Sequence, residues 1–484
     1  MRIIAMRPQI INIINFIRAV EHREPVDLLT PVKKQAELMQ KHKLRGTFLL
    51  QYDALISPEY TDFLKSLDPA QFEFGVWFEV VQPLCEAVGE TWTGRFPWDW
   101  HAQHDLPQGY APEARIKMTD CLFGKFKEVF GSYPRVMGAW VLDTICINHA
   151  DRQYGFDALC CCKEQFGTDG YTLWGGYYGQ GYYPSKKNFF VPAATKENQL
   201  SVPIFRMLGS DPVYQYDFGR NVDGQYDTMQ GVITLEPASG NGGCNPAWVD
   251  WYLRENFNGE CLSFGYAQAG QENSFGWEGM ASGLEYQFRR FEELSRQGKI
   301  EILTLGETGR RFTDAYEITP ASAISAHTAW DDPGKCSFWY SSRYYRINVF
   351  SDENGIRIRD IYTFNENSAD PYLTKRCNTD DIIYETDCVL DGNRQSGNGV
   401  LAGIYPLCEL TDEPFHGNDY VFTDLGNGVC EIAFDALVFR FAPESCSVSH
   451  PDGVKLKKAV GRRSEMPDAD CPVRAVPYRG RTGL

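Results

Sequence analysis

The sequence has no uninterrupted apolar stretch long enough to cross a membrane. Its first residues, Met1 to Pro8, interrupt their apolar run with arginine and proline and offer no small-residue cleavage site, so no signal peptide is expected. The 15 cysteines include no Cys-x-x-Cys pair, and the consecutive Cys160, Cys161 and Cys162 suit buried thiols in a reducing compartment. These absences predict a cytoplasmic protein without a membrane partner or a disulfide framework.

Positive charge is also scarce. The chain has 47 Lys and Arg residues against 64 Asp and Glu residues, which gives a formal net charge of -17. Such a balance argues against a nucleic-acid partner and fits a neutral or cationic small ligand, or a sugar. Basic residues gather only near the end, between Lys455 and Arg481, where a solvated or subunit-contacting tail is expected.

Histidine is rare, with 8 residues in the whole chain. His101 and His104 lie close together in a loop rich in tryptophan and proline, but three-residue spacing outside a helix is a weak metal signal. Surface or hydrogen-bonding roles are therefore expected for both histidines, and no metal site is predicted.

What the chain does contain is a repeated pattern. Short apolar segments that end on polar residues alternate with helix-like segments such as 283–297, in which Leu284, Phe288 and Phe291 share one face. The expected strands are 10–17, 46–50, 72–78, 138–143, 156–162, 204–208, 232–235, 261–266 and 300–305. With 484 residues, more than one domain is expected. The pattern predicts a parallel (β/α)7–8 barrel over residues 1–318.

From Thr319 the pattern changes to apolar and polar alternation. Residues 345–350 and 356–361 flank Asp-Glu-Asn-Gly, and residues 422–434 repeat the pattern around Gly-Asn-Gly, as in β-hairpins. We therefore expect an antiparallel β-sandwich domain over residues 319–484. No pairing of acidic residues in this region suggests chemistry, so a supporting or substrate-shaping role is expected.

Asp143 ends the apolar run Gly-Ala-Trp-Val-Leu-Asp, residues 138–143. A carboxylate at the carboxyl end of a barrel strand is well placed to act as a nucleophile or an acid/base. The structural alternative is that Asp143 caps the helix that follows. Glu236, beside Pro237, and Glu272 lie at or beyond the ends of other expected strands and are further catalytic candidates.

Polar and aromatic residues elsewhere at strand ends or in loops could bind sugar, because carboxylates and amides bond hydroxyls and aromatic faces stack on sugar rings. The alternatives are capping or core packing, and the aromatic insertion after Asp169 would also suit a homo-oligomer contact. Arg18, Glu21 and His22 follow the first strand and could line the same pocket. The candidates to bind substrate are Asp53, Glu79, Trp98, Trp140, Asp169, Trp174, Tyr177, Asp211, Gln271 and Trp277.

Residues 45–50 and 73–77 resemble the second and third strands of the barrel shared by polysaccharide deacetylases and glycoside hydrolase families 57 and 38. Residues 138–143 are similar to the family 57 nucleophile segment, with aspartate in place of glutamate, and residues 269–276 are similar to its acid/base segment. Trp77 and Val81 stand where the deacetylases' paired histidines would be expected, which argues against metal-dependent deacetylation.

The resemblance implies a retaining glycoside hydrolase or transglycosidase with no cofactor and a carbohydrate substrate. It implies Asp143 as nucleophile and Glu272 as acid/base. Glu236, from its own position at another strand end, is the main rival for the acid. A retaining mechanism needs these carboxyls about 5 to 5.5 Å apart. A metal-dependent deacetylase and a glycan-binding barrel without turnover are the alternatives.

Overall fold

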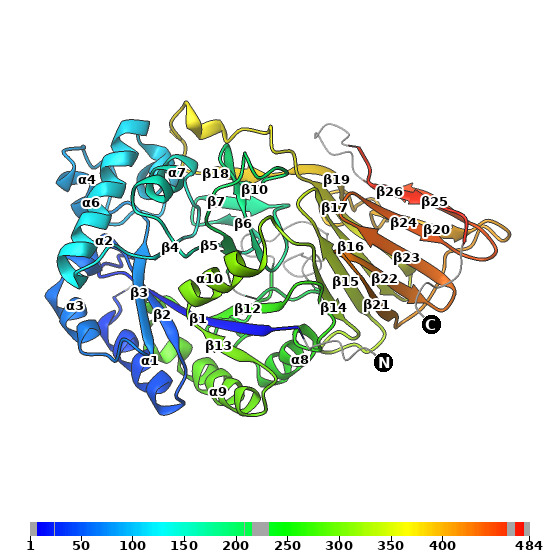
Figure 1. Ribbon diagram of the computed structural model, residues 1–484, viewed down its shortest axis with the longest axis horizontal. Coiled ribbons are helices and arrows are strands. Elements are labelled where there is room, and N and C mark those ends of the chain that lie inside the picture. Colours follow the sequence, from blue (N-terminus) through cyan, green and yellow to red (C-terminus); the bar gives the residue numbers. More distant parts are fainter. Residues whose placement is uncertain (1–6, 24, 208, 215–231, 462–469, 479–484) are drawn as a thin grey trace.

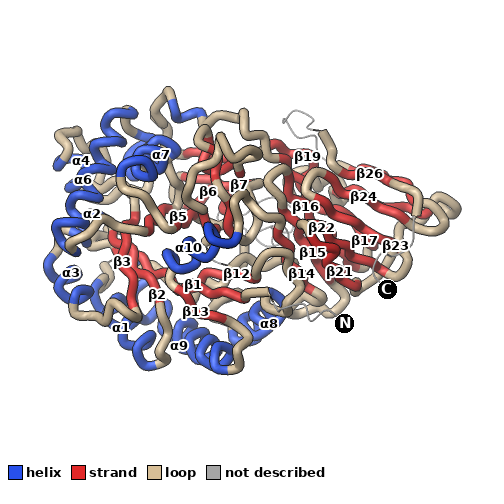
Figure 2. The backbone as a smooth tube through the Cα atoms, in the orientation of Figure 1, coloured by secondary structure: helices blue, strands red, loops and turns tan. Residues whose placement is uncertain are grey.

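The computed structural model describes residues 7–23, 25–207, 209–214, 232–461 and 470–478. A curved α/β part and a part made of antiparallel sheets lie side by side (Figure 1). Helices are concentrated in the first part and strands in the second (Figure 2). In the described part of the chain no helix combines the length and apolar character that a membrane crossing needs.

The first part is built on a curved, mainly parallel sheet with the order β12-β1-β2-β3-β4-β5-β11-β8, in which β13 also pairs with β1. The short β8 runs antiparallel to β11. Its strands are β1 (Gln9–Ile17), β2 (Gly46–Leu50), β3 (Phe72–Trp77), β4 (Val136–Ala139), β5 (Ala158–Cys161), β8 (Gly181–Tyr182), β11 (Ile204–Arg206), β12 (Gly265–Ala269) and β13 (Glu301–Leu303). The sequence-based expectation of a parallel α/β sheet is confirmed at this level.

Helices cover the outside of the curved sheet (Figure 1). They are α1 (Leu29–Lys41), α2 (Tyr52–Leu55), α3 (Pro58–Lys65), α4 (Gln82–Ala87), α5 (Ala102–Asp105), α6 (Pro112–Phe130), α7 (Thr144–Gln153), α8 (Pro246–Asn256) and α9 (Gly276–Arg296). Helix α10 (Leu305–Ala315) instead lies in the middle of this part in Figure 1 and packs against β1 and β5. The expected amphipathic helix corresponds to α9, which buries Leu284, Phe288 and Phe291 against the core. Helix α6 begins with Pro112 and ends at Phe130; the next residue, Gly131, caps it with a φ of 84°, a left-handed conformation that glycine adopts easily.

Most expected strands have somewhat different bounds, and the strand expected over 261–266 is β12, at Gly265–Ala269. Two further differences lie near the carboxyl ends of the strands. The strand expected over 138–143 ends at Ala139, because Asp143 already serves as the N-cap of α7. The segment 232–235 forms only an isolated bridge between Thr234 and Ser210 within the described residues. Between the described residues after β11 and strand β12, backbone hydrogen bonding is limited to one bond, from Gly209 N to Gln268 O at 3.3 Å. Among the described residues no ladder joins those two strands.

Small sheets surround the carboxyl ends of the parallel strands. β6 (Gln165–Thr168) and β7 (Tyr171–Trp174) pair with β18 (Ile382–Glu385), and β9 (Pro184–Ser185) pairs with β10 (Asn188–Pro192). Strand β18 runs parallel to β7, with Ile382 opposite Tyr171. A segment from the second half of the chain therefore returns to cover the first part.

The second part consists of a seven-stranded and a five-stranded sheet. The first contains β14 (Ser322–Ala326), β15 (Cys336–Ser341), β16 (Tyr345–Asp352), β17 (Gly355–Thr363), β19 (Asp387–Asp391), β20 (Gly403–Cys408) and β25 (Val454–Ala459); the second contains β21 (Val421–Gly426), β22 (Val429–Phe434), β23 (Leu437–Ala442), β24 (Ser445–Ser449) and β26 (Val473–Ala475). The expected hairpins are confirmed as β16–β17 and β21–β22. Phe338 of β15 packs on Phe441 of β23 at 5.2 Å, so the two sheets share one core.

A buried chain of charges joins the two parts. Glu164 contacts Arg206 at 3.2 Å through one carboxylate oxygen and Arg346 of β16 at 3.1 Å through the other. Arg346 in turn bonds both oxygens of Asp360, at 3.0 and 2.9 Å. Buried charges are tolerated only when they are paired and hydrogen-bonded, so the two parts must pack in one orientation to satisfy them.

His327 makes a second junction, between Glu260 (2.8 Å from Nε2) and Asp419 (2.6 Å from Nδ1). The hydrogen bond to Glu260, aided by Asp419 and opposed by burial, raises the pKa of His327 from 6.5 to about 9. Because the folded-state value is the higher one, this contribution to stability is complete below pH 6.5 and is lost as pH rises through about 9.

We therefore expect His327→Gln to lower the free energy of unfolding by about 1–3 kcal/mol at pH 6 and to have little effect at pH 10. Urea unfolding of both proteins between these pH values measures the difference. His450→Gln is the control. Among the described residues the carboxylate nearest to the His450 ring is that of Asp452, at 3.9 Å, whereas His327 lies within 2.8 Å of two carboxylates. A difference between wild type and His327→Gln that does not change with pH would contradict the expectation.

Candidate functional site

A cleft of about 820 Å³ opens at the carboxyl ends of the parallel strands. Its walls come from the chain after β1, β4, β5 and β12 and from the loop before α8. The residues that line it are Glu21, Arg23, Pro25, Val26, Trp140, Lys163, Gln165, Thr168, Asp169, Tyr171, Val232, Glu236, Ser239, Gly240, Asn241, Glu272, Ser274 and Phe275. Parallel strands bring residues far apart in sequence to one edge, so this edge is where chemistry can be assembled.

Arg18, directly after β1, lies buried behind the cleft. Its Nη2 atom is 3.1 Å from Glu272 and 3.5 Å from Glu79, and its Nη1 atom is 3.6 Å from Glu21. Trp98 covers the guanidinium, whose Cζ atom is 3.9 Å from the ring centroid. The cation therefore ties together carboxylates that follow three different segments, as a buried charge requires.

The carboxylates around Arg18 have shifted proton affinities. Burial raises the pKa of Glu79 to about 7, against the opposing charge of Arg18 and with a further upward push from Glu272. Burial also raises the pKa of Glu272, again opposed by Arg18 and by the hydroxyl of Ser274, which donates a 2.6 Å hydrogen bond. Gln51 donates to Glu79 at 2.7 Å. Raised carboxyl pKa values favour a side chain that can carry a proton near neutral pH.

Glu236, in the loop before α8, lines the same cleft as Glu272. Its Oε1 atom accepts a 2.8 Å hydrogen bond from Gln271, and its Oε2 atom is 3.7 Å from the ammonium of Lys163. Gln271 is fixed in turn by the backbone N–H of Ala238, which donates to its Oε1 atom at 3.2 Å. The sequence-predicted residues Glu236, Gln271 and Glu272 thus come together, with Lys163 supplying positive charge.

The rim of the cleft carries a second cation. Arg23 bonds Glu21 at 2.9 Å and Asp169 at 3.0 Å, and its guanidinium lies over the Trp98 ring at 4.7 Å. Asp169, expected from the sequence to bind substrate, therefore lines the cleft in an ion pair. Its φ of 42° is the left-handed conformation that Asp tolerates in a tight turn.

Trp140 forms an aromatic wall of the cleft. Its ring packs edge-on against Trp77 at 5.2 Å and Phe16 at 4.8 Å, and lies nearly parallel to Tyr171 at 6.4 Å. Packing from below fixes the ring while part of it stays accessible to the cleft. Such a wall suits the apolar face of a sugar ring.

Asp143 has a different environment. Its Oδ1 atom accepts from the backbone N–H of Cys146 at 2.8 Å, and its Oδ2 atom pairs with the buried Arg115 at 3.0 Å. It is not among the described residues that line the cleft with Glu272. These contacts are those of a helix N-cap, the structural alternative that the sequence also allowed for Asp143.

The remaining predicted residues lie around the cleft or away from it. Asp53 accepts from the backbone N–H groups of Ala19 and Ala54, and burial raises its pKa to about 6. Asp211 accepts from Trp248, and burial likewise raises its pKa to about 6. The rings of Trp174 and Tyr177 are buried, where they donate to Asp391 and to the Pro320 carbonyl, and Trp277 packs on the core.

The loop histidines bond to neighbours. His101 contacts Asp99 at 2.7 Å, and His104 contacts Thr93 at 2.9 Å. Nowhere in the described ranges do three or more His, Cys, Asp or Glu side chains form a group that could hold a metal ion. The carboxylates nearest the cleft instead face Arg18, Arg23 and Lys163, so the described residues do not fit the metal centre of a deacetylase.

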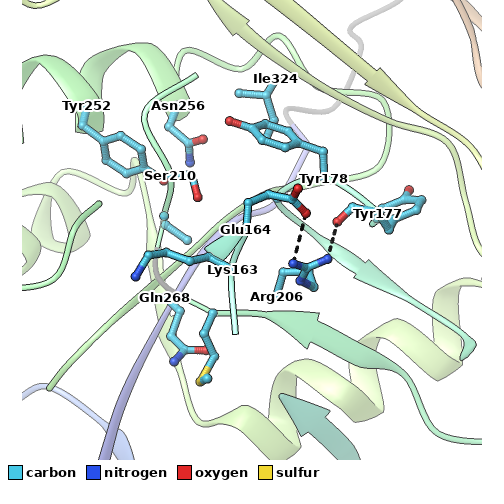
Figure 3. Close-up of a pocket in the computed structure, with 14 residues that line it drawn as sticks. Lys163, Glu164, Tyr177, Tyr178, Arg206, Ser210, Tyr252, Asn256, Gln268 and Ile324 are labelled. Carbon is cyan, nitrogen blue, oxygen red and sulfur yellow. Dashed lines mark hydrogen bonds and ion pairs between the residues drawn. The ribbon is translucent and has the colours of Figure 1, made fainter. Parts of the chain in front are cut away.

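Lys163 was not identified as a cleft residue from the sequence, whereas Tyr171 belongs to the aromatic insertion that was expected to bind sugar. Lys163 and Glu164 follow β5 directly, and Figure 3 shows their side chains running in different directions, with Glu164 toward Arg206. Lys163 and Glu164 also line a small cavity of about 20 Å³, together with Tyr178 and Tyr252. The signal that could have revealed Lys163 is a charged pair immediately after the apolar run 156–162.

Comparisons with known proteins bear on the fold. No family model and no curated protein matches the chain. A candidate glycoside hydrolase/deacetylase from Parabacteroides distasonis aligns over 79% of this chain and 90% of its own, with 13% identity and a TM-score of 0.55. A candidate polysaccharide deacetylase from Mycobacterium smegmatis aligns over 66% of this chain and 94% of its own, with 13% identity and a TM-score of 0.38. The first of these similarities shows a shared fold.

Asp143→Ala should lower the free energy of unfolding by about 2–5 kcal/mol, because it removes a helix cap and leaves Arg115 buried without its carboxylate. Turnover per folded molecule should stay near normal. Chemical unfolding together with any turnover per folded molecule measures both quantities. A variant of unchanged stability that had lost turnover would instead support Asp143 as the nucleophile.

Proposed function

We propose that this protein is a glycoside hydrolase in which Glu236 and Glu272 carry the chemistry. The supporting observation is that these two carboxylates, from separate segments, line one cleft beside the aromatic wall of Trp140. A cleft of about 820 Å³ lined by acidic, amide, hydroxyl and aromatic groups suits an uncharged, hydroxyl-rich ligand. The finer assignment of the fold, a (β/α)7–8 barrel followed by a β-sandwich with a boundary near Thr319, belongs to the same proposal.

The surroundings of the two carboxylates favour a different catalytic role for each. Glu272 is the general acid, since burial raises its pKa and Ser274 holds its orientation. Glu236 is the nucleophile, because Lys163 places positive charge beside it and Gln271 fixes one of its oxygens. The proposal replaces Asp143 by Glu236 in this role, since the contacts of Asp143 are those of a helix cap.

In the first step Glu272 gives its proton to the glycosidic oxygen while Glu236 attacks the anomeric carbon, and the leaving alcohol departs. In the second step Glu272, now ionised, takes a proton from water as the water oxygen attacks the same carbon and releases Glu236. This retaining course requires the two carboxyl groups to be about 5 to 5.5 Å apart when substrate is bound. Arg18 orients Glu272 throughout.

Glu272→Ala should lower kcat on 4-nitrophenyl glycosides by roughly 10²- to 10⁴-fold, because general acid/base catalysis typically contributes that much. Added azide should restore part of the turnover on an activated substrate, since it replaces the water that needs a base. Glu236→Ala should abolish turnover while sugar binding, measured by calorimetry, persists. Glu278→Gln, an exposed residue on α9, is the matched control.

Proton NMR of the first-formed product distinguishes retention from inversion. Normal turnover by both Glu236→Ala and Glu272→Ala would refute the assignment. Binding of sugars without turnover of any glycoside by the wild type would instead indicate a glycan-binding protein.

Turnover should also survive exhaustive dialysis against EDTA. We expect this because the positive charges of Arg18, Arg23 and Lys163 already balance the negative charges of the carboxylates in the site. Release of acetate from acetylated glycans, measured in parallel, tests the deacetylase alternative. Activity lost on chelation and restored by zinc would favour that alternative.

A further inference from the structure

Lys163 brings an ammonium with unused hydrogen-bonding capacity to the floor of the cleft. Its side chain is only 2% exposed, and its Nζ atom lies 3.7 Å from Glu236 Oε2. This distance is too long for a hydrogen bond. Among the described residues the Nζ atom has no hydrogen-bond partner. Removing such a cation from water is costly unless its N–H groups find acceptors, so an acceptor from a ligand would complete the site.

The position of Lys163 is fixed by the residue that follows it. Glu164 is held on one side by Arg206 and on the other by Arg346, all buried. Figure 3 shows the Lys163 side chain extending away from Glu164 and Arg206. The ammonium is therefore held on a rigid backbone, as a specificity-determining group should be.

Glu236 offers the complementary half of the pair. Its Oε1 atom is engaged by Gln271, which leaves Oε2 as the oxygen that faces Lys163. A lysine ammonium can only donate hydrogen bonds and an ionised carboxylate can only accept them. A group that lies between them and satisfies both must accept one hydrogen bond and donate another, as a hydroxyl does.

A carboxylate or phosphate fits this position less well. It has no proton to give to Glu236, and it would add negative charge next to Glu236, Glu272 and Asp169, which line the same cleft. Like charges at such short range destabilise one another. The chemistry of the pair therefore selects a neutral hydroxyl.

We propose that Lys163 and Glu236 together recognise the hydroxyl on the carbon next to the anomeric carbon, so that the substrate is a glycoside with a free 2-hydroxyl. This inference rests on the proposed function, because it takes Glu236 as the nucleophile. When one oxygen of Glu236 bonds to the anomeric carbon, the other oxygen lies beside the hydroxyl on the adjacent carbon of the sugar ring. Hydrogen bonds to this hydroxyl strengthen as charge develops in the transition state, so the pair contributes to rate as well as to selectivity.

The test combines a change in the enzyme with a change in the substrate. The substrates are the best-cleaved member of a panel of 4-nitrophenyl glucosides, galactosides and mannosides in both anomeric forms, and its 2-deoxy counterpart, with uncatalysed hydrolysis subtracted. For the wild type, kcat/KM should fall roughly 10- to 100-fold on the 2-deoxy substrate, the effect of losing a hydrogen bond to charged groups. Lys163→Met should lose a similar factor on the parent and little more on the 2-deoxy substrate.

Lys163→Gln, which keeps a neutral donor, should give intermediate values, and it carries the test if circular dichroism shows Lys163→Met to be unfolded. Lys125→Met is the control, because Lys125 pairs with Glu128 on α6. Equal losses by Lys163→Met on both substrates would overturn the inference while leaving the proposed function intact. Failure of the wild type to cleave any glycoside in the panel would overturn the proposed function and this inference with it.

Discussion

A single buried guanidinium organises the cleft. Arg18 is enclosed by protein and covered by Trp98, where an isolated charge would cost several kcal/mol in lost hydration. The cost is offset by Glu272, Glu79 and Glu21. Because these carboxylates follow different strands, satisfying Arg18 fixes how the ends of β1, β3 and β12 meet. The same contact orients Glu272 at the cleft wall.

The boundary between the two parts follows the same physical rule. Glu164 is buried between Arg206 of the curved sheet and Arg346 of the antiparallel part, and Arg346 is balanced by Asp360. Truncating one member would leave an unpaired charge in the interior, so the parts cannot slide without breaking the chain of ion pairs. Since Lys163 directly precedes Glu164, this packing also sets one wall of the cleft. The antiparallel part thus supports the site although its described residues contribute none of the cleft lining.

Strand β18 extends this support in a second place. It lies beyond Thr319 in sequence yet pairs with β7, whose Tyr171 lines the cleft. Nearby, Asp370 bonds Thr144 at 2.6 Å, and Arg115 donates to the Tyr372 carbonyl at 2.7 Å. A cut of the sequence at 319 therefore does not coincide with a clean spatial division, because chain from 370 to 385 packs on the curved sheet. Domain assignment by change of periodicity cannot detect such a return.

The local pattern of the sequence was sufficient to predict several of the strands and hairpins. Period-2 alternation predicted β16–β17 and β21–β22, and apolar runs predicted β1, β2 and β3, because burial on one or both faces imposes these patterns residue by residue. The positions of Glu236, Gln271 and Glu272 beyond apolar segments were also readable. The end of β4 could not be predicted from the sequence, because the apolar run continues through Trp140 to Leu142 after the strand has ended at Ala139.

The sequence by itself therefore determined that the chain forms parallel strands with helices followed by antiparallel hairpins, and which acidic residues could reach a common edge. Only the tertiary structure distinguished the surroundings of these carboxylates. Asp143 and Glu236 both lie at the ends of apolar segments in the sequence. In the structure, Arg115 and the N–H of Cys146 bind the carboxylate of Asp143, whereas Lys163 and Gln271 lie beside the carboxylate of Glu236 in the cleft. These partners lie from 3 to 73 residues away in sequence, as the spacings between 143 and 146 and between 163 and 236 show. Charge pairing depends on distance in space, which periodicity does not encode.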